Sequence, residues 1–131
     1  MEADLHNVIS EGILKDVHIR FIVYQLAKAL KYLHSGKIIH RDLKPSNILV
    51  NSNCTIKLCD FGLVRSLLPS IGDHSPVLTE GVATRWYRAP EVLLGSKSYS
   101  TPADIWSFGC IIYEILAQKP LFAGSSTLDQ I

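Results

Sequence analysis

The sequence lacks the features that would assign it to several broad classes of protein. A net charge of +1 over 131 residues gives no electrostatic reason to expect nucleic acid or a membrane lipid as a partner. The longest apolar stretch, residues 105–116, is too short to span a bilayer. There is no apolar targeting core near the start, and only three cysteines are present, so we expect a reducing compartment, the cytoplasm, the nucleus or both.

Two segments have the pattern of helices. Apolar residues recur at helical spacing between Asp16, a candidate cap, and Gly36, a suitable stop. Residues 101–104, Thr-Pro-Ala-Asp, are typical of a helix start, with Thr101 as the cap and Asp104 closing a capping box. The helix that follows is apolar on nearly every face through Leu116, so it needs neighbours on all sides.

The densest group of chemically useful side chains lies in residues 40–47, which read His-Arg-Asp-Leu-Lys-Pro-Ser-Asn. This run combines the Asp42 carboxylate, the Lys44 ammonium and the Asn47 amide, and a second carboxylate, Asp60, follows in Asp-Phe-Gly. Residues 48–50 and 56–58 are apolar runs separated by turn formers, which predicts a short hairpin that folds Asp60 back beside the first group. Such a site suits Mg²⁺ and phosphoryl groups, because Mg²⁺ prefers a few carboxylate or amide oxygens plus phosphate oxygens.

These motifs resemble those of eukaryotic protein kinases. The matching segments, in kinase order and spacing, are residues 40–47, 60–62, Ala89-Pro90-Glu91 and 104–109. Residues 83–88 and Lys44-Pro45-Ser46-Asn47 resemble the mitogen-activated group, and residues 1–6 resemble the hinge of its extracellular-signal-regulated branch, including atypical members. The resemblance implies a mainly α fold, an incomplete kinase-like large (C-terminal) lobe with a short β-hairpin beside the catalytic loop.

The same resemblance divides residues 1–131 as one partial protein kinase domain. Residues 1–15 would be the hinge and following helix, 16–36 the long helix, 37–62 the catalytic loop and metal turn, 63–91 the activation loop, and 92–131 the central helix and following loop. No glycine-rich phosphate loop, strand lysine or paired glutamate precedes the hinge, and no later helices follow. We therefore expect poor solubility and no measurable ATP turnover from residues 1–131 alone.

The resemblance implies a serine/threonine kinase that uses ATP and Mg²⁺ on proteins with Ser/Thr-Pro sites. Asp42 would accept or orient the proton of the substrate hydroxyl, and Lys44 would reach the γ-phosphate. Thr84 would hydrogen-bond both residues when its loop is ordered. Asn47 and Asp60 would supply oxygens to Mg²⁺, and Val82 and Ala83 would accept the proline that follows the target residue.

Three further residues would contact the nucleotide. Met1 matches the backbone site for adenine, Asp4 the carboxylate that meets the ribose, and Leu49 the apolar floor under the base. Asp4 has an alternative role as the charge at a helix start. Cys59, which precedes Asp60, either faces the nucleotide pocket or is a buried, inert thiol.

The loop before residue 82 departs from the family at one position. Thr79-Glu80 stands where the family has Thr-Glu-Tyr, but the third residue here is Gly81. We expect Thr79 to remain phosphorylatable, by an upstream kinase or by autophosphorylation, unless Gly81 reflects an error in the sequence. A phosphate there needs arginine partners, and Arg41 and Arg65 match those of the family. Arg85 and Arg88 match the arginines that hold the family's phosphotyrosine, so we expect them to pair with Glu80 or another anion here.

Several residues have two interpretations at this stage. His40 could be a general base, but we favour a core residue that holds the loop, and we expect Trp106 and Phe108 in the core. Asp104 could cap its helix, brace the catalytic-loop backbone, or do both. Finally, the protein could be an inactive docking module, because the turn at residues 51–54 and the helix at 16–35 resemble the surface where the family docks linear peptides.

Overall fold

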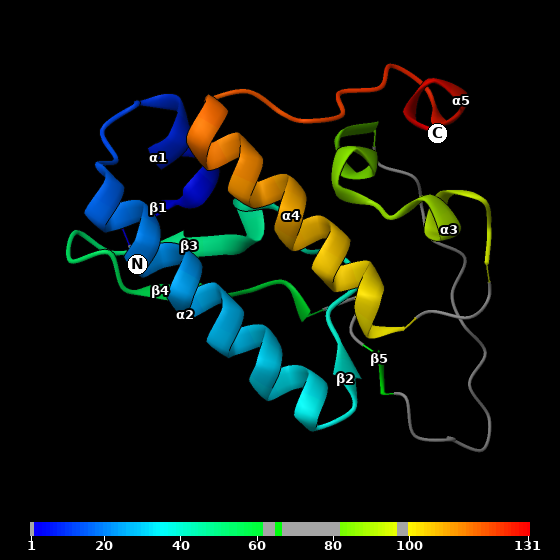
Figure 1. Ribbon diagram of the computed structural model, residues 1–131, viewed down its shortest axis with the longest axis horizontal. Helices are drawn as coiled ribbons and strands as arrows, with labels where there is room; N and C mark the ends of the chain where they lie inside the picture. The colour runs from blue at the N-terminus through cyan, green and yellow to red at the C-terminus, as the bar shows by residue number, and fades with distance from the viewer. Residues whose placement is uncertain (1, 62–64, 67–81, 97–99) are drawn as a thin grey trace.

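The computed structural model describes residues 2–61, 65–66, 82–96 and 100–131. Two long helices, α2 (Asp16–Ser35) and α4 (Thr101–Ala117), pack against each other, and α2 also contacts a small antiparallel sheet (Figure 1). The shorter helices are α1 (Leu5–Ser10), α3 (Pro90–Leu93), α5 (Thr127–Gln130) and the 3₁₀ turns η1 (Pro45–Asn47) and η3 (Val82–Tyr87). The predicted mainly helical fold with a small hairpin is confirmed.

Helix α2 spans the residues that its periodicity predicts. Ile22, Leu26 and Leu30 are buried at four-residue intervals, which places them on one face of the helix. These residues pack in one core cluster with Leu5 of α1, Ile48, and residues of α4. The apolar stripe of α2 therefore shares one core with Leu43 and Ile48, which lie among the candidate site residues in the sequence.

The ends of α2 differ in detail from the prediction. Lys15, not Asp16, is the cap residue, and its backbone N–H donates to Nδ1 of His18 at 3.1 Å. Asp16 is the first helical residue and pairs with Arg20 at 2.7 Å. Its carboxylate is therefore used on the helix surface rather than as a cap.

Helix α4 begins as predicted but uses its polar residues differently. The prediction that Thr101 caps the helix with Asp104 in a capping box is wrong: Ser100 is the cap residue, and the Asp104 carboxylate accepts backbone N–H groups of the catalytic loop instead. Trp106 was expected in the core, and this is wrong: it is 38 % exposed and stacks on Phe122, whereas Phe108 does pack against the core. Trp106 faces outward because it lies two positions after the buried Asp104, which is about 200° around the helix.

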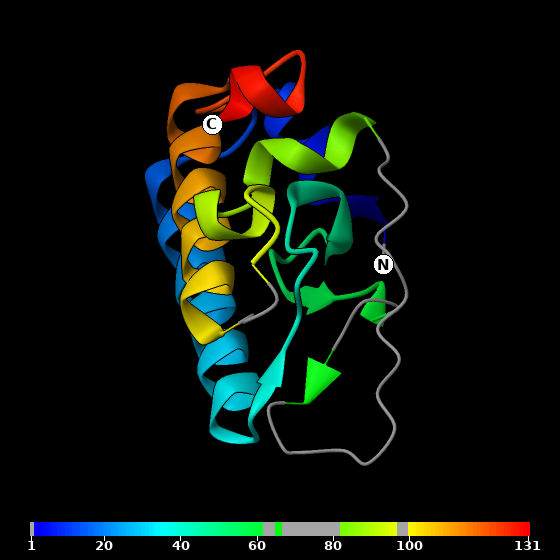
Figure 2. The same cartoon turned by 90° about the vertical axis from the view of Figure 1, so that its right-hand side faces the viewer.

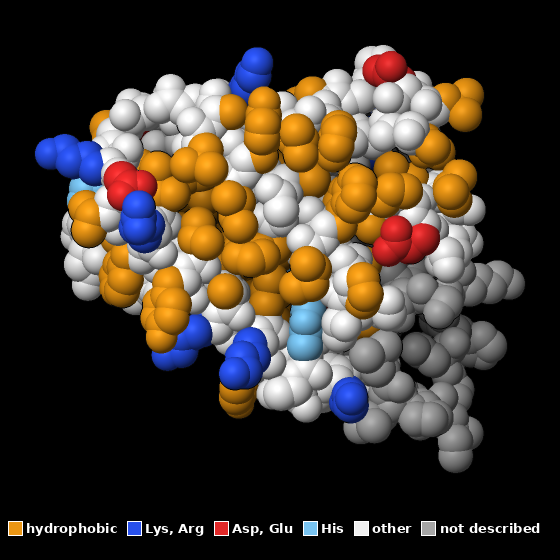
Figure 3. Space-filling model, viewed as in Figure 1, with side chains coloured by type: hydrophobic (Ala, Val, Ile, Leu, Met, Phe, Trp, Pro, Cys, Tyr) orange, Lys and Arg blue, Asp and Glu red, His pale blue; other side chains and the backbone are white. Residues whose placement is uncertain are grey.

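The outward side of α4 remains apolar. Ile105 and Leu116 are 51 % and 64 % exposed, and Figure 3 shows hydrophobic side chains gathered over this helix. The expectation that α4 needs neighbours on all sides is thus met on one side only among the described residues. Single exposed apolar residues are common on proteins, but a run along one helix marks a contact face.

The predicted hairpin pairs β3 (Ile48–Val50) with β4 (Ile56–Leu58), with Leu49 opposite Lys57. In the turn, Cys54 adopts φ 61° and donates its N–H to the carbonyl of Asn51 at 2.8 Å. A third strand, β1 (Ala3–Asp4), adds to the other edge of β3. A separate two-stranded sheet joins β2 (Ile38–Ile39) to β5 (Arg65–Ser66). These two-residue strands are too short to produce a periodic signal in the sequence.

Candidate active site

The catalytic loop rises from β2 to η1 beside α4 (Figure 2). Its three candidate side chains meet: Lys44 Nζ lies 3.2 Å from Oδ2 of Asp42, and Nδ2 of Asn47 lies 3.2 Å from the same oxygen. Asn47 Nδ2 also donates to the Asp42 carbonyl at 2.9 Å. The Asp42 side chain is 9 % exposed, so this carboxylate is nearly buried and has two donors at one oxygen.

The hairpin brings the end of β4, just before Asp60, back to the end of η1, as the sequence predicts. The N–H of Cys59 donates to the carbonyl of Asn47 at 2.9 Å, which ties the end of β4 to the end of η1. Asp60 follows directly, is exposed and has φ 58°. A left-handed backbone at a residue other than glycine is uncommon and clusters at functional turns.

The His40 ring connects the two segments. Its Nδ1 accepts the N–H of Asp42 at 3.3 Å, so its Nε2 carries the proton and donates to the carbonyl of Cys59 at 3.1 Å. The residue is fully buried, and its ring contacts that of Phe61 at 5.2 Å between centroids. Because both ring nitrogens are occupied within the protein, His40 holds the loop, and the general-base interpretation fails.

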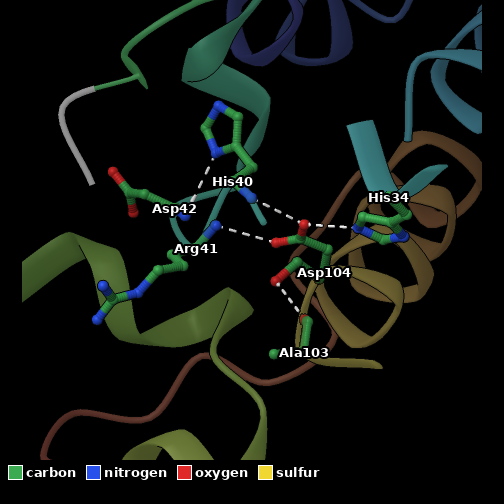
Figure 4. Close-up of polar contacts among 7 residues, drawn as sticks. His34, His40, Arg41, Asp42, Ala103 and Asp104 are labelled. Atoms are coloured by element: carbon green, nitrogen blue, oxygen red, sulfur yellow. Dashed lines mark hydrogen bonds and ion pairs between the residues drawn. The ribbon is translucent and has the colours of Figure 1, made fainter. Parts of the chain in front are cut away.

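Asp104 holds the backbone of the same loop from α4. Its Oδ2 accepts the N–H of His40 at 2.9 Å and its Oδ1 accepts the N–H of Arg41 at 3.0 Å (Figure 4). Arg41 has φ 72°, a strained backbone that persists only where surrounding contacts impose it. The brace role of Asp104 is therefore what the structure shows.

The nucleotide-side candidates lie on the sheet. Asp4 and Leu49 are direct partners in the β1–β3 register, so they occupy the same face of the sheet. Asp4 caps α1, since its Oδ1 accepts the N–H of Asn7 at 2.9 Å. Burial, and then the charges of Asp60 and Asp4, raise the pKa of the neighbouring Cys59 thiol, so its thiolate form is disfavoured.

Residue Tyr87 anchors η3 to α4 by two buried contacts. Its hydroxyl donates to Oε2 of Glu114 at 2.6 Å, and Ser107 Oγ donates to its carbonyl at 2.5 Å. Burial, together with the Glu114 contact, raises the pKa of Tyr87 far above its usual range. Burial also raises the pKa of Cys110 to about 11. The neutral hydroxyl of Tyr87 thus donates to the buried side chain of Glu114 where η3 packs on α4.

Of the three predicted phosphate-binding arginines whose side chains the structure describes, two line one pocket and the third does not. Arg41 and Arg88 line one small pocket together with Asp104. Arg85 instead donates from Nη1 to the carbonyl of Ser125 at 3.3 Å. The candidates Met1 and Thr79, and the side chains of Arg65 and Thr84, lie outside the described residues.

Sequence reasoning missed the histidine that completes the Asp104 cluster. His34 Nε2 lies 2.8 Å from Asp104 Oδ2, although the two residues are 70 positions apart. Glu114 and Tyr87 were likewise not paired in advance. A basic residue in the last turn of a helix was the only signal for His34, and that signal is common on surfaces.

No cluster of three or more His, Cys, Asp or Glu side chains able to hold a metal ion is found among the residues that the structure describes. A site made of one amide, one carboxylate and phosphate oxygens does not need such a cluster, and that donor set suits Mg²⁺. Within the same described part of the chain, no helix is both long and apolar enough to cross a membrane.

Comparison with known proteins agrees with this geometry. Residues 1–131 match the protein kinase domain family over their whole length, so the chain belongs to that family. Its fold, mostly helical with a small antiparallel sheet, is that of part of a kinase domain.

The relatives identify the branch. The chain is 56 % identical over 133 residues to "Extracellular signal-regulated kinase 2" of Dictyostelium discoideum and 60 % identical over 133 residues to "Mitogen-activated protein kinase 15" of Xenopus laevis. It is 57 % identical over 137 residues to "Mitogen-activated protein kinase 15" of Caenorhabditis elegans. These alignments cover 100 % of this chain but only 36 %, 23 % and 29 % of those relatives. The resemblance to mitogen-activated kinases is confirmed.

Proposed function

We propose that this chain carries the phosphoryl-transfer site of a serine/threonine kinase of the mitogen-activated type. The observation that carries the proposal is the Asp42 carboxylate, which is nearly buried and lies 3.2 Å from both Lys44 Nζ and Asn47 Nδ2. Phosphoryl transfer depends mainly on positioning and charge neutralisation, and this trio supplies both.

In the proposed reaction a Ser or Thr hydroxyl attacks the γ-phosphorus of ATP. The new oxygen–phosphorus bond forms as the bond from the γ-phosphorus to the bridging oxygen breaks, and ADP leaves with that electron pair. Asp42 orients the hydroxyl and takes its proton. Lys44 neutralises charge on the transferred phosphoryl group. Its Nζ lies 3.2 Å from Oδ2 of Asp42, so both side chains can contact the same substrate.

Asn47 and Asp60 would hold Mg²⁺, which neutralises phosphate charge when bound. Nδ2 of Asn47 is used on Asp42, so the amide oxygen is the group left for a cation. The N–H of Cys59 donates to the backbone carbonyl of Asn47 at 2.9 Å, so Asp60 comes one residue after the point where the two segments are joined. The two oxygens and a nucleotide phosphate fit the Mg²⁺ preference for mixed protein, phosphate and water ligands.

Other parts of the proposal concern recognition and control. Asp4 retains acceptor capacity for a ribose hydroxyl beside its contact to Asn7, and Leu49 lies next to it on the sheet. By resemblance to the family, the proposal also includes proline-directed specificity through residues 82–84. It further includes phosphorylation of Thr79 and the binding of that phosphate by arginines. We place the protein in the cytoplasm or nucleus, a placement that its free cysteines support.

The test compares Asp42→Asn with Asp16→Asn, a matched change at an exposed carboxylate on α2. Phosphate transfer from Mg-ATP to a Ser-Pro peptide and to its Ser-Ala counterpart is measured with residues 1–131 placed in a complete kinase domain, as in every later assay of kcat, because residues 1–131 alone are expected to give no measurable turnover. We expect Asp42→Asn to lower kcat at least about a hundredfold, and Asp16→Asn to leave it within about twofold. A slow Asp16→Asn, or an active Asp42→Asn, would refute the role of Asp42. Equal rates on both peptides would refute the proline-directed specificity but not the role of Asp42.

A second candidate is a docking module of the same fold without activity. Phe21 and Tyr24 of α2 are 46 % and 60 % exposed and precede Gln25 by four residues and by one. Gln25 Nε2 donates to the Cys54 carbonyl in the hairpin turn at 2.8 Å. An apolar face beside a turn can bind a linear peptide. If this is the sole function, Asp42→Ala leaves peptide binding unchanged and the unmodified protein transfers no phosphate.

A further inference from the structure

Residues 122–130, which we call the clasp, are closed by hydrogen bonds among themselves. The side-chain amide of Gln130 bridges the segment, since its Oε1 accepts the N–H of Gly124 at 2.8 Å and its Nε2 donates to the carbonyl of Phe122 at 3.0 Å. The N–H of Ser125 is also bonded within the clasp, at 2.9 Å. Because these N–H groups are used inside the segment, the carbonyls of Gly124 and Ser125 can accept from elsewhere in the protein.

Two side chains of η3 bind those two carbonyls. Nε1 of Trp86 donates to the carbonyl of Gly124 at 3.0 Å, and Nη1 of Arg85 donates to the carbonyl of Ser125 at 3.3 Å. Helix α5, which ends the clasp, lies against η3, as Figure 2 shows near the C-terminus. Two consecutive residues of η3 therefore bind two consecutive carbonyls of the clasp.

The clasp is itself attached to α4. The ring of Phe122 stacks on that of Trp106, with 5.8 Å between the centroids and 17° between the planes. Tyr87, the last residue of η3, is held by Glu114 of the same helix. The last three residues of η3 thus all have partners, and two of those partners belong to the clasp.

The conformation of η3 depends on these contacts. It is a 3₁₀ helix of six residues, and such runs are uncommon because the hydrogen-bond geometry of a 3₁₀ helix is poor. Under the proposed function, residues 82–84 at the start of η3 accept the proline that follows the target residue. Because these anchors lie at residues 85–87, they control how the start of η3 is presented to a peptide.

We propose that the clasp determines specificity: by holding Arg85 and Trp86 it sets the conformation of η3 that selects proline after the target Ser or Thr. This role rests on the proposed proline-directed kinase function. Gly124 allows a test that leaves the side chains of η3 unchanged. An added Cβ there would lie 2.6 Å from Oε1 and 2.8 Å from both the backbone N and the Cα of Gln130, so the clasp would have to open.

The kinetic arm uses three changes and one matched control. Gly124→Ala opens the clasp by collision, and Gln130→Ala opens it by removing the amide bridge. Trp86→Phe keeps an aromatic ring but removes the N–H that binds the clasp. Gly36→Ala is the control, at an exposed position where the nearest neighbouring atom to an added Cβ is 3.4 Å away. Each variant is assayed on the matched Ser-Pro and Ser-Ala peptides.

We expect Gly124→Ala and Gln130→Ala to lower the ratio of kcat/KM on Ser-Pro to that on Ser-Ala at least about fivefold, with KM for ATP within about twofold. Trp86→Phe should change the ratio in the same direction, and Gly36→Ala should match the unmodified domain. A merely structural role would slow transfer to both peptides alike and keep the ratio. A ratio within about twofold of the unmodified value in either clasp variant would therefore overturn the proposal.

The second arm measures the indole N–H of Trp86 by NMR, with Trp86→Phe identifying its signal. We expect faster hydrogen exchange of this N–H in Gly124→Ala and Gln130→Ala than in the unmodified domain or in Gly36→Ala, because its acceptor carbonyl is displaced. Equal exchange in all of them would overturn the proposal whatever the kinetics.

The outcomes separate this role from the function on which it rests. If the unmodified domain transfers no phosphate, the kinase function fails, and if it transfers equally to both peptides, proline direction fails; either result also ends the role of the clasp. If the unmodified domain prefers Ser-Pro and Gly124→Ala keeps that preference, the clasp alone is refuted. Should Gly124→Ala not fold, Gln130→Ala decides both arms.

Discussion

The hairpin β3–β4 and the catalytic loop adjoin each other in the chain and in space, yet they are held in different ways. The hairpin is closed by its own ladder and by a turn contact between Asn51 and Cys54. The loop donates two of its backbone N–H groups to Asp104, which lies 63 and 64 positions away. The hairpin is thus a local structure, whereas the loop keeps its shape only while α4 is packed in place.

The largest expected effect comes from Asp104→Asn, which should break the loop and leave the hairpin intact. It replaces one acceptor oxygen by a donor that faces backbone N–H groups, in a buried site. We expect a loss of about 3 kcal/mol of stability by urea denaturation and about a hundredfold loss in kcat. Asp129→Asn, an exposed first-turn carboxylate of α5, is the matched control and should change both far less. Equal effects of the two changes would contradict the comparison.

Val50→Ala should instead lower the stability of the protein without changing its rate of phosphate transfer. Val50 is 4 % exposed and lies on β3, two residues after Ile48, where the hairpin begins. Its truncation should cost about 2 kcal/mol in urea denaturation, with kcat per folded molecule within about twofold. Lys57→Ala on the same hairpin, at an exposed site, serves as control. A fall in kcat as large as that of Asp104→Asn would show that the two regions are not separable.

Gln25→Ala tests how the hairpin is attached to α2. Its side chain donates to the Cys54 carbonyl at 2.8 Å and accepts the N–H of Ile56 at 3.2 Å. Removing both contacts in a partly buried place should cost about 1 kcal/mol, measured as a shift in the urea midpoint. Lys28→Ala, exposed on the same helix, should be nearly neutral. A neutral Gln25→Ala would mean that apolar packing alone holds the hairpin.

The smallest effect compares two cysteines, one in the hairpin and one on α4, the helix that holds the loop. Burial raises the pKa of Cys110 on α4 to about 11, so its reactive thiolate is scarce below that pH, and the side chain is also enclosed. At about pH 8 iodoacetamide should modify Cys54 in the hairpin turn first, with Cys110 reacting only after urea is added. Peptide mapping at successive times gives the order in which the two cysteines are modified. Modification of Cys110 in the folded protein would show that the α4 core opens readily.

Much of the fold follows from local patterns. The periodicity of α2, the Thr-Pro start of α4 and the paired apolar runs of the hairpin all predicted elements that the structure contains. Trp106 was misplaced because α4 is apolar on most faces, so its sequence does not mark which face is inside. The grouping of Asp42, Lys44 and Asn47 was predictable because they lie within six residues of one another.

The amino-acid sequence by itself determined the family, the positions of the long helices and the local trio of the catalytic loop, because each depends on residues near one another in the chain. Tertiary structure alone decided the contacts that give the trio its geometry. His34 reaches Asp104 across 70 positions, and Tyr87 reaches Glu114 across 27. Such pairs have no local pattern, since they depend on how α2, η3 and α4 pack rather than on sequence spacing.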